Sequence, residues 1–278
     1  MAISALALFD RLVPKDRGTA RVARDIPYGT HARQRLDLYA PVRPTGRLPL
    51  LVFAYGGGWN AGTRTEYHFV GHAFAGLGYL TAVPDYRVHP EVHFPDFVTD
   101  LGLAASWLMA NGGAHGGDVS RVMLAGHSAG AYNAVMLGLD PVRFGAPKLA
   151  GRVEGIVGLS GPYDFFPFDV KESIDAFGQA LEPERTQPVN LVTSGAPPML
   201  LAHGVKDPTV GDYHTVRLAL KLREAGVPVV ERHYPELTHA ELVIALARPL
   251  RRLLPVYADV AAFLAPGGGP RDAAARMG

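Results

Sequence analysis

The chain has 278 residues, of which 48% are hydrophobic and 19% charged; its formal net charge is +1 and it has no cysteine. This length and composition are typical of a globular protein with one substantial core, and the near-zero charge gives no sign of a nucleic-acid partner or an anionic membrane surface. The lack of cysteine excludes disulfides, a thiolate nucleophile and cysteine-ligated metal sites.

An apolar stretch opens the chain over residues 1–9, but no basic residue precedes it and Asp10 and Arg11 interrupt it. We therefore expect a short amphipathic helix within a helical extension over residues 1–25, and not a secretory signal. No other apolar run approaches the ~20 residues that span a bilayer. A cytoplasmic location without a membrane partner is the default expectation.

Strand-like and helix-like segments alternate along the chain, which predicts an α/β fold with a mainly parallel sheet flanked by helices. Several strand-like segments are almost entirely apolar, as in strands that are covered on both faces. The expected strands are 35–39, 50–54, 80–84, 121–125, 154–159, 199–202 and 229–234. The expected helices are 67–77, 94–111, 129–139, 213–225, 240–247 and 256–264.

We expect a single domain over residues 1–278. The stretch 164–197 is rich in proline, phenylalanine and charged residues, and we interpret it as a small lid-like excursion or one wall of the substrate pocket. Its cluster of Phe165, Phe166 and Phe168 either lines an acyl pocket or forms the underside of the lid, and the second interpretation is favoured. The tail over 265–278 lacks a core-forming pattern and is expected to be disordered.

Three consecutive glycines follow the expected strand 50–54, in the sequence Tyr55-Gly56-Gly57-Gly58-Trp59. Glycine is costly in backbone entropy, so such a run makes sense where the backbone must come close to a ligand. We expect the amides of Gly57 and Gly58 to serve as donors of an oxyanion hole. The alternative is a flexible surface loop, which the position directly after a buried strand disfavours.

A serine stands between two glycines at a strand-to-helix turn, in the sequence Gly126-His127-Ser128-Ala129-Gly130. This arrangement is typical of the nucleophile elbow, in which small neighbours let strand and helix approach while the serine hydroxyl stands clear. Ser128 is therefore the candidate nucleophile, and the amide of Ala129 is expected to complete the oxyanion hole. The alternative, that Ser128 only caps a helix, is disfavoured by the flanking glycines.

Two further candidates follow later strands. Asp207 comes after the strand 199–202 and directly before a proline, and His239 comes after the strand 229–234. Parallel strands end at one edge of a sheet, where ligands bind in open α/β folds, so both residues are expected beside Ser128. His239 would act as general base and acid, and Asp207 would orient it. Asp207 could instead merely cap the next helix, and Glu236 and Asp212 are the rival acids.

The remaining histidines give weaker signals. His127 is expected to point away from the serine hydroxyl or to line the pocket. The pairs His68/His72 and His89/His93 have the four-residue spacing of metal ligands, but neither has a third ligand pattern. We interpret them as packing or solvated histidines and expect no metal and no cofactor.

At this point the chain resembles the α/β-hydrolase-fold carboxylesterases of the hormone-sensitive-lipase, bacterial-esterase and kynurenine-formamidase-like type, from about residue 28 to residue 264. The resemblance rests on Leu36-Asp37-Leu38-Tyr39, the Tyr55–Trp59 stretch, Asp85-Tyr86-Arg87 with Phe94-Pro95, the elbow, Asp207 and His239. It implies that Asp85-Tyr86-Arg87 is a structural loop without a catalytic role.

One residue departs from the pattern of that family, which usually has histidine where this chain has Tyr55. The backbone donors do not depend on this side chain, so catalysis should survive. Two roles for Tyr55 stay open: it shapes the oxyanion loop, or it points its hydroxyl into the site. The hypothesis that we carry forward is that the hydroxyl orients the loop.

The sequence thus predicts a serine carboxylesterase that acts on small to medium acyl esters through an acyl-enzyme. An arylformamidase needs the same groups and is the alternative. A non-enzymatic alternative is a binding protein that has the hydrolase fold but no activity, and it is disfavoured because every catalytic element is present. The expected partner is a small-molecule ester or amide, and a homo-oligomer stays open.

Overall fold

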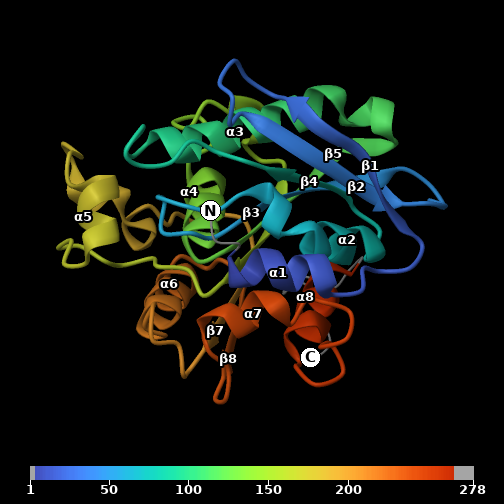
Figure 1. The fold of residues 1–278 in the computed structure, drawn as a ribbon. Coiled ribbons are helices and arrows are strands. Elements are labelled where there is room, and N and C mark those ends of the chain that lie inside the picture. The colour runs from blue at the N-terminus through green and yellow to red at the C-terminus, as the bar shows by residue number, and fades with distance from the viewer. Residues whose placement is uncertain (1–3, 266–278) are drawn as a thin grey trace.

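The computed structural model describes residues 4–265, which form an eight-stranded sheet flanked by helices (Figure 1). The spatial order is β1-β2-β4-β3-β5-β6-β7-β8. The pairs β1–β2 and β2–β4 are antiparallel, and all the other neighbouring pairs are parallel. The strands are β1 Thr19–Pro27, β2 Arg35–Pro41, β3 Leu48–Ala54, β4 Leu80–Pro84, β5 Gly117–His127, β6 Val153–Leu159, β7 Met199–Gly204 and β8 Val229–Tyr234. The expected α/β fold with a mainly parallel sheet is confirmed.

Helices cover the sheet and join most of the parallel strands. They are α1 Ala5–Leu12, α2 His68–Gly76, α3 Asp96–Asn111, α4 Ala129–Leu139, α5 Lys171–Phe177, α6 Tyr213–Glu224, α7 His239–Ile244 and α8 Val256–Leu264. Helix α2 packs on β2 and β4, whereas α3 and α4 pack on each other and on β3 and β5. No helix within residues 4–265 is long and apolar enough to cross a bilayer.

The N-terminal region differs from the expected helical extension over 1–25. It is helical only over Ala5–Leu12, and Thr19–Pro27 form β1, which pairs antiparallel with β2 at the edge of the sheet. The physical reason is that an edge strand is half solvated: β1 has no fully buried residue and contains charged side chains, so it lacks the apolar run by which the central strands are recognised.

The central strands and α4 form the middle of the core. Strand β4 is buried along its whole length, and ten consecutive residues of α4, from Ala129 to Gly138, are buried. A helix buried on all sides has no polar face to present to water, which is why its sequence is apolar almost throughout. The Gly126–Gly130 turn that the sequence predicts to be the nucleophile elbow joins β5 to α4 within this core.

The stretch 164–197 contains α5 and the short 3₁₀ helices Pro183–Thr186 and Pro188–Asn190. The expected disorder over 265–278 lies, apart from residue 265, outside the described residues. The single-domain organisation stays a prediction.

Candidate active site

Ser128 occupies the turn between β5 and α4 in a conformation that L-residues rarely adopt. Its φ is 55° and its ψ is −126°, and holding a non-glycine residue there costs on the order of 1–3 kcal/mol. The turn is fixed on both sides, because the amide of Ser128 donates to the carbonyl of Leu159 at 2.8 Å and its own carbonyl accepts from Ala131 at 2.9 Å. The surrounding sheet thus holds the serine in a strained but defined position.

The two elbow glycines are required by close backbone contacts. A Cβ on Gly126 would overlap the carbonyl oxygen of Gly130, and a Cβ on Gly130 would overlap the carbonyl oxygens of Ala54 and Tyr55. The crossing of β5, α4 and the end of β3 is therefore possible only without side chains at these positions. The same packing brings the end of β3 beside the serine.

The glycine run after β3 lies against the elbow, where the oxyanion hole was expected. A Cβ on Gly56 would come within 2.9 Å of the Cβ of Ser128, and Gly57 and Gly58 have φ values of 138° and 55°. Within residues 4–265 the amides of Gly57, Gly58 and Ala129 have no recorded hydrogen-bond acceptor. Their role as the donors that stabilise a tetrahedral oxyanion stays a prediction.

The indole of Trp59 fixes the far end of this loop. Its Nε1–H donates to Oδ1 of Asn133 in α4 at 3.1 Å, and its ring packs edge-on against Phe177 with centroids 4.8 Å apart. Gly58 also lies next to the side chain of Glu172 in α5. The excursion therefore lies over the oxyanion loop.

Asp207 and His239 lie together at the carboxyl ends of β7 and β8. Nδ1 of His239 is 2.6 Å from Oδ2 of Asp207, a short hydrogen bond to a carboxylate. His239 is the first residue of α7, whose start is fixed because Glu241 accepts from both the amide and the hydroxyl of Thr238 at 2.7 Å. This capping box places the imidazole, although α7 starts one residue before the expected range 240–247.

Asp207 does not cap the next helix, which was the alternative considered for it, because that helix, α6, begins at Tyr213 with Asp212 as its N-cap residue. Oδ1 of Asp207 accepts from the amides of Thr209 at 2.8 Å and Val210 at 2.9 Å, so the residue caps its own loop while it holds the histidine. The rival acids face elsewhere: Glu236 pairs with Lys206, and Asp212 lies 3.7 Å from His233. Asp207 is thus the carboxylate that contacts His239.

His203 is a member of this cluster that sequence reasoning missed. It is fully buried, with Nε2 2.8 Å from the carbonyl of Val210 and 3.3 Å from Oδ2 of Asp207. Burial raises the pKa of Asp207, but the hydrogen bonds from His203 and His239 outweigh it and hold that pKa far below its usual value. Asp207 therefore stays ionised at any working pH. The His203-Gly204-x-x-Asp207 sequence was the available signal.

The structure records no hydrogen bond between Ser128 Oγ and another residue within 4–265. The serine and the histidine are instead linked through the neighbouring residue, because Nε2 of His127 is 3.0 Å from the carbonyl oxygen of His239. In unliganded enzymes the catalytic hydrogen bond is often formed only when substrate binds. The ring of His127 lies beside that of His239, with centroids 4.9 Å apart, and its orientation relative to the serine hydroxyl stays a prediction.

Two buried histidines predict a pH dependence of stability. Burial is the main cause that lowers the pKa of His127 to about 3 and that of His214 to about 4, from 6.5. The unfolded chain therefore binds two protons near pH 5 that the folded chain does not, so the free energy of unfolding falls as the pH falls below about 6.5. We expect each histidine to cost about 2 kcal/mol between pH 7 and pH 5.

Chemical denaturation at the two pH values measures this effect. In His214→Gln, which removes one of the two groups, the loss of stability on acidification should be smaller than in the wild-type chain. An equal loss in both proteins would contradict the assignment of the effect to that buried histidine.

Tyr55 lies under the oxyanion loop and not in the site. It is fully buried, its ring stacks on Tyr86 with centroids 4.6 Å apart, and its hydroxyl accepts from Nη2 of Arg33 at 3.0 Å. The same nitrogen donates to the carbonyl of Gly62 at 2.8 Å, and Nε donates to the carbonyl of Tyr86 at 2.8 Å. Arg33 thus joins the tyrosine hydroxyl to the end of the loop, in line with the hypothesis that Tyr55 orients it.

We expect Tyr55→Phe to lower kcat for ester hydrolysis about tenfold, which corresponds to ~1.4 kcal/mol, with little change in KM. The reason is that Arg33 loses a hydrogen-bond acceptor and the end of the glycine loop is then held less firmly. Steady-state kinetics check this. Tyr39→Phe is the control, because the buried hydroxyl of Tyr39 in β2 has no hydrogen-bond partner among the described residues. Unchanged turnover in Tyr55→Phe would remove the orienting role.

The phenylalanines of the excursion divide into two kinds. Phe165 stacks on Trp59 and contacts Phe177, with centroids 5.9 and 5.1 Å apart, and Phe168 packs on Phe177 at 5.7 Å. Phe166 is 42% exposed. Phe165 and Phe168 therefore pack inward as the underside of the excursion, in line with the favoured interpretation.

The histidine pairs with metal-like spacing have other partners. His68 bonds Asp10 and Arg21 at 2.8 Å, His72 lies 2.7 Å from Thr19, and His89 packs edge-on against His93. Within residues 4–265 no group of three or more His, Cys, Asp or Glu side chains is placed to hold a metal ion.

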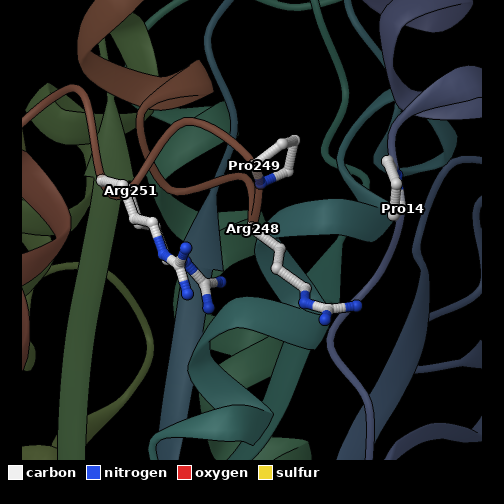
Figure 2. A pocket seen from close by; sticks show the side chains of 5 residues that line it. Pro14, Arg248, Pro249 and Arg251 are labelled. Carbon is white, nitrogen blue, oxygen red and sulfur yellow. The ribbon is translucent and has the colours of Figure 1, made fainter.

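A cavity of about 580 Å³ lies beside the segment that follows α1 (Figure 2). Pro14, Arg248, Pro249, Arg251 and Arg252 line it. Arg251 pairs with Asp16, Nη2 to Oδ2 at 2.7 Å, and so ties this loop to the N-terminal segment. None of the candidate catalytic side chains lines the cavity.

The BD-FAE family model matches residues 36–222, about two thirds of the chain. The isoprenylcysteine alpha-carbonyl methylesterase ICME of Arabidopsis thaliana is 29% identical over 83% of this chain and 59% of its own length. Esterase LipC of Mycobacterium tuberculosis is 32% identical over 66% of this chain and 51% of its own length. The chain thus spans about half to three fifths of the length of these curated relatives.

Solved structures share the fold at low identity. Esterase B from Lactobacillus rhamnosis superposes with a TM-score of 0.76 at 19% identity, covering 98% of this chain and 96% of that one, in a structure described as inhibited. A truncated carbohydrate esterase from gut microbiota gives a TM-score of 0.75 at 18% identity, covering 90% and 99%. At this identity the likeness establishes the fold.

Proposed function

The chain belongs to the BD-FAE family, and on this premise we propose that it is a serine carboxylesterase that hydrolyses small to medium acyl esters through an acyl-enzyme. The observation that carries the proposal is the 2.6 Å contact between His239 and Asp207, at the sheet edge where Ser128 occupies a strained strand-to-helix turn. Relatives named as esterases and a methylesterase support it.

In the proposed reaction, Ser128 Oγ attacks the ester carbonyl carbon while Nε2 of His239 takes the hydroxyl proton. Asp207, held ionised by its hydrogen bonds, keeps the proton of the neutral imidazole on Nδ1 and stabilises the imidazolium that forms. The amides of Gly57, Gly58 and Ala129 stabilise the tetrahedral oxyanion.

Collapse of this intermediate breaks the bond from carbon to the alcohol oxygen, and the departing alcohol takes the proton from His239. A water molecule then repeats the sequence: His239 removes its proton, the water oxygen attacks the acyl carbon, and Ser128 is released with the proton returned. The products are the acid and the alcohol, and no other reactant is needed.

The experiment compares turnover of p-nitrophenyl esters of graded acyl length with turnover of N-formylkynurenine, and Ser128→Ala serves as the control. A maximum on short acyl chains that the substitution abolishes is the expected result. Faster turnover of the formamide would move the assignment to an arylformamidase, and activity that survives in Ser128→Ala would remove the proposed mechanism. The cytoplasmic location and the lack of a nucleic-acid partner stay predictions.

A further inference from the structure

His127 stands at the end of β5, directly before the serine, and contacts the proposed base. The residue is only 5% exposed, its Nε2 lies 3.0 Å from the carbonyl oxygen of His239, and the two rings are 4.9 Å apart at 49°. A carbonyl oxygen can only accept a hydrogen bond. The proton of His127 is therefore on Nε2, and this N–H holds the main chain at the first residue of α7.

The other ring nitrogen faces the oxyanion loop. Nδ1 of His127 is buried without a hydrogen-bond partner among the described residues, and a Cβ on Gly56 would come within 3.0 Å of it. Among residues 4–265 no group is placed to accept a hydrogen bond from Nδ1, so a protonated ring would leave a buried donor unsatisfied. The ionisable groups that act on this ring are His239, Asp207 and His203.

Burial and the neighbouring His239 keep the pKa of His127 near 3, so the ring is neutral at neutral pH. This matters during turnover, because the ring of His239 becomes cationic while it rests against that of His127. A second cation at that distance would oppose proton transfer to the base. A neutral aromatic ring that also donates to the base's own carbonyl avoids this conflict.

We propose that His127 is a positioning residue that fixes His239 relative to Ser128 by its hydrogen bond to the His239 carbonyl. This inference rests on the proposed function and adds a role to the elbow. The side chain before the nucleophile bonds the main chain of the proposed base and lies next to Gly56 in the glycine loop. One side chain thus sets the mutual position of the catalytic parts.

The test compares His127→Gln, whose amide can donate from the position of Nε2, with His127→Leu, which keeps much of the volume but has no donor. We expect kcat on a p-nitrophenyl ester to fall on the order of 10- to 100-fold in His127→Leu with KM nearly unchanged, since small displacements of a base are costly. We expect the Gln variant to recover most of that loss.

His214→Leu is the matched control, since His214 is also buried with a low pKa but bonds the amides of Tyr163 and Asp164 and has no recorded contact with Ser128, Asp207 or His239. Thermal melts show which variants are folded. The far-downfield proton signal of the His239–Asp207 hydrogen bond gives a readout independent of turnover: it should persist in the Gln variant and weaken in the Leu variant.

Three outcomes would overturn the inference: full kcat in His127→Leu, equal losses in the Leu and Gln variants at equal folded fraction, or an equal loss in His214→Leu. Failure of the proposed function looks different, because the wild-type chain would then turn over neither esters nor the formamide. In that case the proton signal alone decides whether His127 positions His239, and an unchanged signal in His127→Leu would reject it.

Discussion

Replacement of Ser128 by alanine is expected to lower kcat on a short acyl ester by roughly 10⁵-fold or more, because no other group can form the acyl-enzyme. The folded state should be retained or slightly stabilised, because the serine at φ 55° makes no side-chain hydrogen bond to another described residue. Single-turnover and steady-state assays on the same ester measure the effect.

A second serine offers a matched control for this substitution. Ser160 follows β6 as Ser128 follows β5, it has a positive φ of 48°, and its buried hydroxyl has no hydrogen-bond partner among the described residues. Ser160→Ala should leave kcat within a few-fold of the wild-type value. A large loss in both variants would indicate that strained turns at this sheet edge tolerate no change, and a small loss in Ser128→Ala would reject Ser128 as nucleophile.

Asp207→Asn is expected to lower kcat about 10⁴-fold while the loop stays folded, an effect that follows from the wrong histidine tautomer. The two oxygens of Asp207 separate the two roles: Oδ1 accepts from the amides of Thr209 and Val210, and Oδ2 faces His239. An asparagine at position 207 can keep its oxygen toward the two amides. Its NH₂ group then donates to Nδ1 of His239, so Nδ1 must be unprotonated and the imidazole proton lies on Nε2. The base then points its N–H at the serine and cannot take the proton.

Comparison with Asp207→Ala and Asp212→Asn completes this experiment. The alanine variant loses the cap as well, so it should lose both kcat and stability, by about 1 kcal/mol or more. Asp212→Asn, which alters the rival acid, should keep normal kcat. If Asp212→Asn is inactive and Asp207→Asn is not, the acid has been assigned to the wrong loop.

The central sheet was predictable because each of its strands can be recognised from its own apolar sequence. Strand β4 and the end of β5 are apolar runs that are followed by turn residues. The two glycines of the elbow indicate that backbone segments approach each other closely there. The edge strand β1 was missed because half of its environment is water: it contains charged residues, and its burial neither forms an apolar run nor alternates along the strand.

The supporting residues of the site were out of reach for a different reason. His203 touches Asp207, which is near in sequence, but Arg33 reaches Tyr55 and Gly62 across 22 and 29 positions, and His127 reaches His239 across 112. Such contacts depend on which strand ends meet at the sheet edge, and no local spacing encodes them. Ser128, Asp207 and His239 were accessible because strand order alone places the ends of parallel strands together.

The most direct test of the account is to treat the protein with an organophosphonate ester that mimics the tetrahedral intermediate and to map the adduct by peptide mass spectrometry. The account predicts one phosphonyl group per chain, on Ser128, with loss of esterase activity in proportion to labelling, and no labelling of Ser128→Ala. An adduct on another residue, or full inactivation with Ser128 unmodified, would contradict it.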